Sequence, residues 1–302
     1  MSNEKVLVFG ICRSTLTLTC DGQGEGDAGS YETVLGGHGE TMAVAVARLG
    51  GKSVFCGRVG DDSGGKRLVR LLDGAGVDLS CFRVDREAQT GFSVRILRAG
   101  AGEETIVFPG ADKNLNEEQI RTAFLCAPDA VCLSAALPRP ALDCICRLAR
   151  EHGIPVFLNY GTDGAEVGGL SELEVFSPDG EAAYAMTGVR PAGAESCLAA
   201  AIEMQKRVRA RYYVLRLGDR GAFVYDGTYC HMVSSYVMQQ TDLRGADDVF
   251  FAAMVLEYLR VGRDILPACA YAAAASALTV ARAGEAASVP DADEVLTFLE
   301  RS

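Results

Sequence analysis

Short apolar runs alternate with longer helical patterns along this chain. Four runs have the length and the residue types of buried β-strands, at residues 5–9, 130–133, 155–158 and 212–217. Strands that alternate with helices are typical of βαβ units, in which helices cover both faces of a parallel sheet. The pattern therefore predicts an α/β fold with a mainly parallel central sheet.

Two further segments depart from this alternation. Residues 15–34 and 90–108 contain alternating and Gly-rich stretches, which predict a small β-sheet that projects from the main sheet as a lid. The chain contains no internal repeat, low-complexity tract or long linker. We therefore expect residues 1–302 to form a single domain with a substantial core.

The most apolar helical pattern begins at a small turn that carries two acids. Gly245-Ala246-Asp247-Asp248 runs into residues 249–259, where Glu257 is the only clearly polar residue. The first turn of a helix has N–H groups without intrahelical partners, and these favour an anion such as phosphate. An aspartate beside that turn can take a proton from an attacking hydroxyl, although a plain N-cap is the simpler interpretation.

Charge and composition narrow the class of protein. The formal net charge is −11 and there is no basic tract, which argues against a nucleic-acid surface. The first residues lack the pattern of a secretory signal, and no run reaches the roughly 18 apolar residues that span a membrane. We therefore expect a cytoplasmic protein that binds neither nucleic acid nor membrane.

Cysteine and histidine residues do not predict a metal site. The eleven cysteines include no C-x-x-C pair, and His38, His152 and His231 lack the spacing of metal ligands. Most cysteines are expected to be small core residues. No residue is assigned as a metal ligand.

Two motifs, at residues 36–62 in the N-terminal half and at residues 242–250 in the C-terminal half, resemble the signatures of the ribokinase-like (PfkB) family of carbohydrate kinases. Residues 36–62 follow the family's G-G-x-G-A-N-x-A, A-R-L-G and G-x-V-G-D-D elements. Residues 242–250 match D-T-x-G-A-G-D-x-F without a gap, with Phe250 on its aromatic position. Similar segments lie between and after them in family order, at 109–112, 157–160, 177–188, 215–222 and 280–290. The resemblance covers nearly the whole chain.

The resemblance implies a three-layer ribokinase-like fold and ATP-dependent phosphorylation of a hydroxyl group on a sugar or sugar-like molecule, with a nucleoside also open. It implies ATP and Mg²⁺ as cofactors, leaves a monovalent cation open, and suggests a homodimer formed through the lid. By position, Asp248 is the general base. The anion hole is Gly245, Ala246 and Asp247. The nucleotide-binding residues are Asp179, Arg216, Gly218, Gly221, Ala275 and Gly284. The substrate-binding residues are Thr15, Gly37, His38, Thr41, Ala136 and Asp248.

Several residues depart from the family pattern at these positions. Asp247 replaces the second glycine of G-A-G-D, and two like charges about 5 Å apart repel by roughly 3 kcal/mol at an effective dielectric near 20. Arg244 could pair with Asp247 or contact a phosphate itself. Ala182 stands where the family's P-N-x-x-E element has its glutamate, although Glu181 is adjacent.

The sugar side departs further. Thr15, Thr41 and Ala136 stand where ribokinase-like enzymes hold substrate hydroxyls with acidic or amide side chains. Charged acceptors contribute more to such hydrogen bonds than neutral groups do. The alternative to a sugar kinase is therefore a catalytically impaired member of the family that acts as a ligand-binding or regulatory protein.

Overall fold

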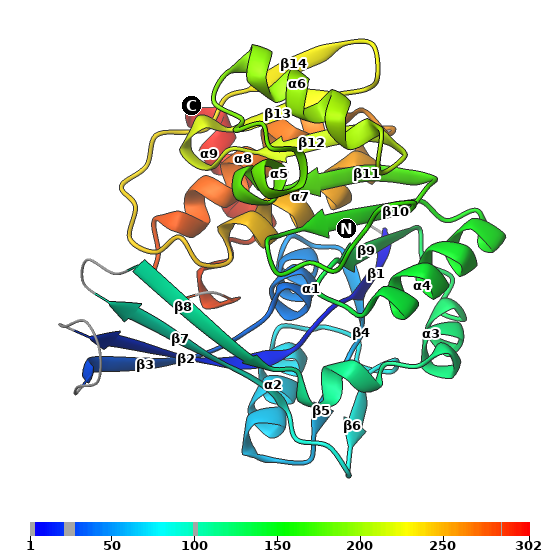
Figure 1. Cartoon of the computed structure of the whole chain (residues 1–302), viewed down its shortest axis with the longest axis vertical. Helices are drawn as coiled ribbons and strands as arrows, with labels where there is room; N and C mark the ends of the chain where they lie inside the picture. Colours follow the sequence, from blue (N-terminus) through cyan, green and yellow to red (C-terminus); the bar gives the residue numbers. More distant parts are fainter. Residues whose placement is uncertain (1–3, 21–27, 99–101, 285) are drawn as a thin grey trace.

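The computed structural model describes residues 4–20, 28–98, 102–284 and 286–302. Its largest sheet has the strand order β14-β13-β12-β11-β10-β9-β1-β4 (Figure 1). Neighbouring strands from β4 to β12 are parallel, whereas β13 and β14 are antiparallel. These strands are β1 (Lys5–Phe9), β4 (Lys52–Cys56), β9 (Ala130–Ser134), β10 (Val156–Tyr160), β11 (Leu173–Pro178), β12 (Ala210–Arg216), β13 (Ala222–Tyr225) and β14 (Cys230–Val233).

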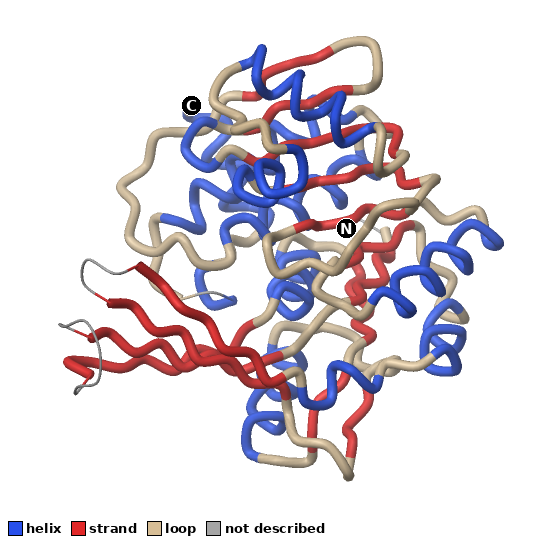
Figure 2. The backbone as a smooth tube through the Cα atoms, viewed as in Figure 1, coloured by secondary structure: helices blue, strands red, loops and turns tan. Residues whose placement is uncertain are grey.

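Helices pack on both faces of this sheet, because alternate strand residues point to opposite sides. On one face, Val6 and Val8 of β1 join the core formed with α1 (His38–Arg48), α2 (Ser63–Gly74), α7 (Ala246–Arg260), α8 (Ile265–Val280) and α9 (Ala292–Arg301). On the other face, Leu7 and Phe9 pack with α3 (Glu117–Phe124), α4 (Arg139–His152), α5 (Gly180–Thr187) and α6 (Ala194–Gln205). The three layers are visible in Figure 2.

A separate four-stranded sheet projects from one side of this body (Figures 1 and 2). Its strand order is β3-β2-β7-β8, with β2 parallel to β7 and antiparallel to β3. The strands are β2 (Arg13–Cys20), β3 (Ala28–Gly36), β7 (Gly91–Arg98) and β8 (Gly102–Phe108). The small sheet that the sequence predicts is thus present. Residues 21–27 and 99–101 of the predicted segments lie outside the described residues.

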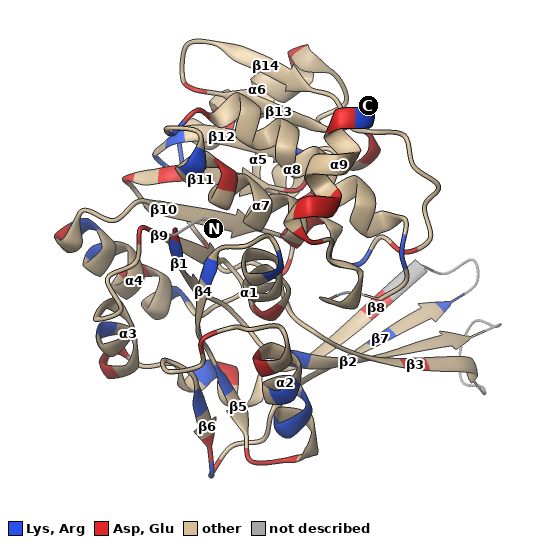
Figure 3. Ribbon diagram, turned by 180° about the vertical axis from the view of Figure 1, so that it is seen from behind, with Lys and Arg blue, Asp and Glu red and all other residues tan. Residues whose placement is uncertain are grey.

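Shorter elements complete the chain. β5 (Arg58–Gly60) pairs with β6 (Arg83–Asp85), and 3-10 helices occupy Gly110–Asn114, Gly218–Arg220 and Ala286–Ser288. Within the described residues, no helix is both long and apolar enough to cross a bilayer. Basic and acidic residues are interspersed on α2 and α3 in the view of Figure 3.

The structure confirms the predicted α/β fold with a mostly parallel sheet. The run at 5–9 coincides with β1, and the ends of the other three predicted runs fall within two residues of those of β9, β10 and β12. Six of the eleven cysteines are buried, four are partly buried and Cys230 is exposed.

Candidate active site

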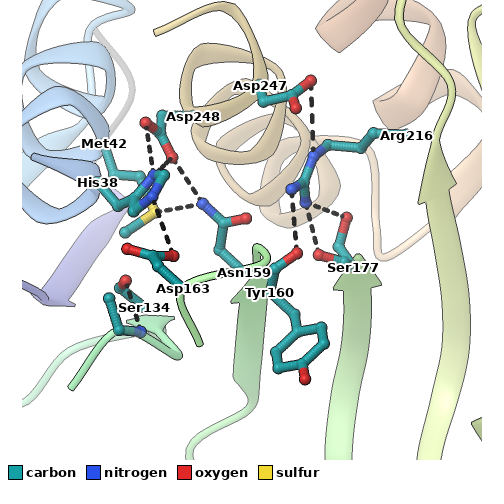
Figure 4. A network of polar contacts seen from close by, with 11 residues as sticks. His38, Met42, Ser134, Asn159, Tyr160, Asp163, Ser177, Arg216, Asp247 and Asp248 are labelled. Atoms are coloured by element: carbon teal, nitrogen blue, oxygen red, sulfur yellow. Dashed lines mark hydrogen bonds and ion pairs between the residues drawn. The ribbon is translucent and has the colours of Figure 1, made fainter. Parts of the chain in front are cut away.

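Polar side chains gather where the parallel strands end. Ser134 ends β9, Asn159 lies near the end of β10, Ser177 near that of β11, and Arg216 ends β12 (Figure 4). The first turns of α1 and α7 lie beside these strand ends. Ligands of open α/β sheets bind outside the carboxyl ends of the strands, so this edge is the place to look for a site.

Glycine allows α1 to begin directly above β1. A Cβ atom on Gly39 would lie 2.6 Å from backbone atoms of Gly10, which follows β1. Real Cβ atoms do not approach a backbone so closely, so a larger residue at position 39 would push the helix away. The close approach places His38, the first residue of α1, over the end of the sheet.

Asp248 lies at the centre of the polar network, in the first turn of α7. Its side chain is 5% exposed. His38 Nδ1 lies 3.0 and 3.1 Å from its two carboxylate oxygens, and Asn159 Nδ2 donates to Oδ1 at 2.7 Å. The carboxylate therefore has a hydrogen-bond partner on each oxygen without any contribution from solvent (Figure 4).

His38 is the more accessible member of this pair. Its side chain is 39% exposed, and Nε2 lies 3.5 Å from Oδ1 of Asp163 on the loop after β10. The negative charge of Asp248 raises the His38 pKa well above 6.5, and Asp163 acts in the same direction. Hydrogen bonding and the charge of His38 in turn lower the Asp163 pKa, against the opposing effect of burial.

The turn before α7 has the geometry of a helix-terminal anion site. Gly245 adopts a left-handed conformation with φ of 74°, which an L side chain rarely adopts, and α7 begins at the next residue. The first-turn N–H groups are thereby directed to one side of the strand ends. The interior of α7 is almost entirely buried, so the turn is held rigidly.

Arg216 supplies a cation next to this turn. Its side chain is 4% exposed, and Nη1 donates to the carbonyl oxygen and the hydroxyl of Ser177 at 2.5 and 3.0 Å. Nε lies 3.7 Å from a carboxylate oxygen of Asp247, whose side chain is 52% exposed. The buried guanidinium thus partly balances the charge of Asp247.

A cavity of about 430 Å³ opens beside the same turn. Its walls come from the first residues of α7, the turn around Gly218 and Gly221, the segment 235–240 and the end of α8. Arg216, Ala246, Asp247 and Phe250 line it, whereas Asp248 does not. The volume is in the range of small-molecule sites.

Only some of the residues expected to bind nucleotide line this cavity. Arg216, Gly218 and Gly221 line the cavity. Asp179 caps α5, and Ala275 is buried within α8. The N–H of Gly284 donates to Asp242 at 3.1 Å. Their roles stay predictions.

The residues expected to bind the substrate come from several elements, and their roles also stay predictions. Gly37 is the N-cap of α1, and Ala136 follows β9, where its N–H donates to the Ser134 hydroxyl at 3.3 Å. Thr15 exchanges a 2.8 Å hydrogen bond with Ser93 on β7. Thr41 is fully buried in α1.

The possible pairing of Arg244 with Asp247 needs revision. Arg244 pairs with Asp242 at 2.7 Å and with Glu32 of β3 at 2.9 Å, and it is Arg216 that lies near Asp247. The loop before α7 directs Arg244 back toward Asp242, two residues earlier. Glu181 forms an exposed ion pair with Arg190 at 2.6 Å.

Sequence reasoning did not assign Asn159, Asp163 or Ser177 to the site. Asn159 directly follows the apolar run at 155–158, so a polar residue ending a predicted strand could have identified it. Asp163 lies in a loop and carries no comparable signal. Among the described residues, no group of three or more His, Cys, Asp or Glu side chains forms a ready metal site.

Comparison with known proteins agrees with the observed fold. The chain is 26% identical over 279 residues to a ribokinase of Haemophilus influenzae, covering 90% of each chain. It is 27% identical over 332 residues to fructokinase-1 of Oryza sativa, covering 99% of this chain and 98% of the other. The structure of Arabidopsis thaliana ribokinase with ribose and ATP superposes with a TM-score of 0.85, at 24% identity and full coverage of both chains.

The fold is that of a ribokinase-like α/β protein, with a mostly parallel central sheet, helices on both faces and a separate small sheet. The model of the pfkB family of carbohydrate kinases matches residues 3–292. The chain belongs to this family.

Proposed function

We propose that this protein transfers the γ-phosphoryl group of ATP to a hydroxyl group of a sugar or a sugar-like small molecule. The observation that carries the proposal is the arrangement around the first turn of α7. Ala246 and Asp247 of that turn line the cavity, while Asp248 of the same turn faces the His38–Asn159 cluster. A nucleotide and an acceptor hydroxyl bound on the two sides would meet at the N–H groups of this turn.

The cavity suits ATP in size and in chemistry. Its volume of about 430 Å³ accommodates a nucleoside, and apolar walls such as Val237, Ala273 and Ala277 suit a base. The α7 N-terminus and Arg216 would hold the phosphates. Mg²⁺ is commonly bound through substrate phosphates and a few water molecules, and it would neutralise charge on the transferring group. The solved structure of a putative ribokinase II from E. coli holds ATP and Mg²⁺, which supports the same pairing here.

Asp248 is the proposed general base of this reaction. It is held by two hydrogen-bonded neighbours, and its carboxylate lies on the acceptor side of the turn. Removing the hydroxyl proton in the transition state typically contributes 10²–10⁴-fold to the rate.

A second candidate function is ligand binding or regulation without catalysis. Asp247 at the anion turn and Ala182 in place of a family glutamate favour it. Retention of Asp248 favours catalysis. Under both candidate functions, the proposal includes a homodimer formed through the small sheet. The edge strands of that sheet expose the large apolar side chains of Tyr31 and Ile106.

The test begins with a thermal-shift screen of sugars and nucleosides, with and without Mg-ATP, since a ligand of the folded state raises its melting temperature. Hits then enter an ADP-release assay. We expect Asp248→Asn to lower kcat by about 10²–10⁴-fold with little loss of stability. Asp293→Asn changes an exposed first-turn aspartate of α9 and is the matched control. Ligand binding without phosphorylation of any hit would favour the second function.

A further inference from the structure

Arg216 is held in place by neighbouring protein groups, yet one of its nitrogen atoms makes no hydrogen bond. Nη1 donates to the carbonyl oxygen and the hydroxyl of Ser177, and Nη2 donates to the carbonyl oxygen of Tyr160 at 3.4 Å. Nε has no hydrogen-bond partner among the described residues, and the carboxylate oxygen of Asp247 lies 3.7 Å from it, beyond hydrogen-bond distance (Figure 4). Because Arg216 lines the cavity, a phosphate bound there meets a fixed guanidinium with one N–H to donate.

Asp247 lines the same cavity. Its side chain is 52% exposed, whereas the side chain of Asp248 is 5% exposed and contacts His38 and Asn159. A phosphate that binds both Arg216 and the first-turn N–H groups of α7 would therefore lie against the carboxyl group of Asp247. An ionised carboxylate only accepts hydrogen bonds and repels a phosphate, whereas a neutral carboxylic acid can donate a hydrogen bond to it.

We propose that Asp247 binds the phosphate groups of the nucleotide as a neutral acid, so that nucleotide binding takes up a proton from the solvent. The proton adds to a carboxylate oxygen of Asp247, and the resulting O–H donates to a phosphate oxygen while Arg216 Nε donates to the same phosphate chain. No other covalent bond forms or breaks. The proposal rests on the proposed function for its ligand, ATP, and it leaves Asp248 as the general base. It makes the protonation state of Asp247 a determinant of nucleotide affinity.

The surroundings of Asp247 favour its protonation. Burial is the largest cause that raises the pKa of Asp247 above 3.8, against the opposing charge of Arg216. The carboxylates of Asp179 and Asp248 act in the same direction as burial. A bound phosphate adds negative charge and competes for Arg216, so the pKa of Asp247 is higher in the complex than in the free protein. The charged groups around Asp247 come from five elements: Asp179 at the N-cap of α5, Arg216 of β12, Asp219 of the 3-10 helix Gly218–Arg220, Asp248 of α7 and His38 of α1.

The resulting pH dependence has a definite sign. A carboxyl group whose pKa is higher in the complex than in the free protein favours binding at a pH below its free pKa. This effect is lost as the pH rises through the pKa of the complex. The affinity of the protein for Mg-ATP should therefore fall as Asp247 ionises and level off once it is fully ionised. A group whose ionisation weakens binding about tenfold to hundredfold takes up at most about 0.5 to 0.8 proton on binding.

Calorimetry measures this proton uptake directly. Mg-ATP is titrated into the protein without an acceptor, between about pH 5 and about pH 8, in buffers of different ionisation enthalpy, because the observed heat then depends on the number of protons exchanged with the buffer. Asp247→Asn keeps the shape and a donor group but cannot take up the proton. Asp219→Asn removes an exposed acid of the same cavity and is the matched control. Adenosine, which has no phosphate, is the control ligand, and thermal unfolding checks that each variant is folded.

We expect the wild type and Asp219→Asn to take up about 0.5 to 0.8 proton more than Asp247→Asn at the pH of maximal uptake. Comparison with Asp247→Asn cancels the protons that the nucleotide itself exchanges. The wild-type Kd for Mg-ATP should rise with pH until it is about tenfold to hundredfold above that of Asp247→Asn, and the two values should approach each other toward the acid end of the range. Adenosine binding should be the same in all three proteins.

Equal proton uptake by the wild type and Asp247→Asn, with Mg-ATP bound by both, would overturn the inference and leave the kinase function standing. Weaker binding to Asp247→Asn at every pH would also overturn it, since the ionised carboxylate would then hold the Mg²⁺ of the complex. If the uptake is found but D-ribose, D-fructose and adenosine are not phosphorylated, the inference stands and the kinase function fails for these acceptors. If neither the wild type nor Asp247→Asn binds Mg-ATP at any pH, the inference and the proposed function are both wrong.

Discussion

The Nε atom of Arg216 lies 3.7 Å from the carboxylate of Asp247, at the mouth of the proposed nucleotide cavity. A carboxylate at this turn opposes a bound phosphate, and the buried guanidinium offsets part of that effect. The family pattern has glycine at position 247, so the pair is a particular feature of this chain.

We expect Asp247→Asn to tighten Mg-ATP binding by about tenfold to a hundredfold. Loss of the like charge contributes up to roughly 3 kcal/mol, from which the present compensation by Arg216 is subtracted. Isothermal calorimetry at fixed Mg²⁺ measures the change. Asp219→Asn, which removes an exposed charge from the same cavity away from α7, is the control. Weaker binding to Asp247→Asn would mean that the carboxylate helps to hold the nucleotide complex.

A second prediction concerns the acceptor. None of the three expected substrate residues offers a charged group to a sugar. Thr41 is fully buried, the Thr15 hydroxyl is hydrogen-bonded to Ser93, and Ala136 has no polar side chain. We expect D-ribose to be phosphorylated with a kcat/KM below roughly 10⁴ M⁻¹s⁻¹, the lower end of ordinary enzymes. An active ribokinase in the same assay is the control. Ordinary efficiency with ribose would refute the argument.

The strands, the buried helix α7 and the turn before it could be predicted because each depends on consecutive residues of the sequence. Periodicity identifies β1, and Gly245 next to two acids and an apolar run identifies the start of α7. The resemblance to a known family added the three-layer ribokinase-like arrangement.

Side-chain partners could not be predicted in the same way. His38 and Asp248 are 210 positions apart, and Arg244 and Glu32 are 212 positions apart. Such contacts depend on how strand ends and helix termini converge after folding. They also depend on which of several nearby carboxylates a basic side chain contacts. Arg244 could reach Asp247 by spacing, yet Asp242 offers it both carboxylate oxygens and Glu32 a second carboxylate.

The small sheet leads to a third prediction. Its edge strands β3 and β8 expose Tyr31 at 75%, Ile106 at 56% and Phe108 at 48% of their surface, which is unusual for large apolar residues in a monomer. We expect sedimentation to show a dimer for the wild type and a shift toward monomer for Ile106→Asp. Leu125→Asp, at an exposed leucine that ends α3, is the control. A monomeric wild type would contradict dimerisation through this sheet.

The last prediction concerns Asp242, which joins the loop before α7 to its surroundings. Arg244 donates to both of its oxygens, the Gly284 N–H donates as well, and the Asp242 side chain is only 11% exposed. These hydrogen bonds, those from the Arg244 side chain foremost, lower the Asp242 pKa from 3.8 to about 2. Because the folded pKa is depressed, the stabilising effect is present above pH 3.8 and is lost as the pH falls toward 2.

We therefore expect Asp242→Asn to lower the free energy of unfolding by about 2 kcal/mol at pH 7, and by progressively less between pH 4 and pH 2. Urea unfolding across this range measures the difference. Glu32→Gln removes the outer carboxylate on Arg244, which is 58% exposed, and should cost less than about 1 kcal/mol. A cost for Asp242→Asn that stays constant from pH 7 to pH 2 would show that Asp242 acts through packing and not through its charge.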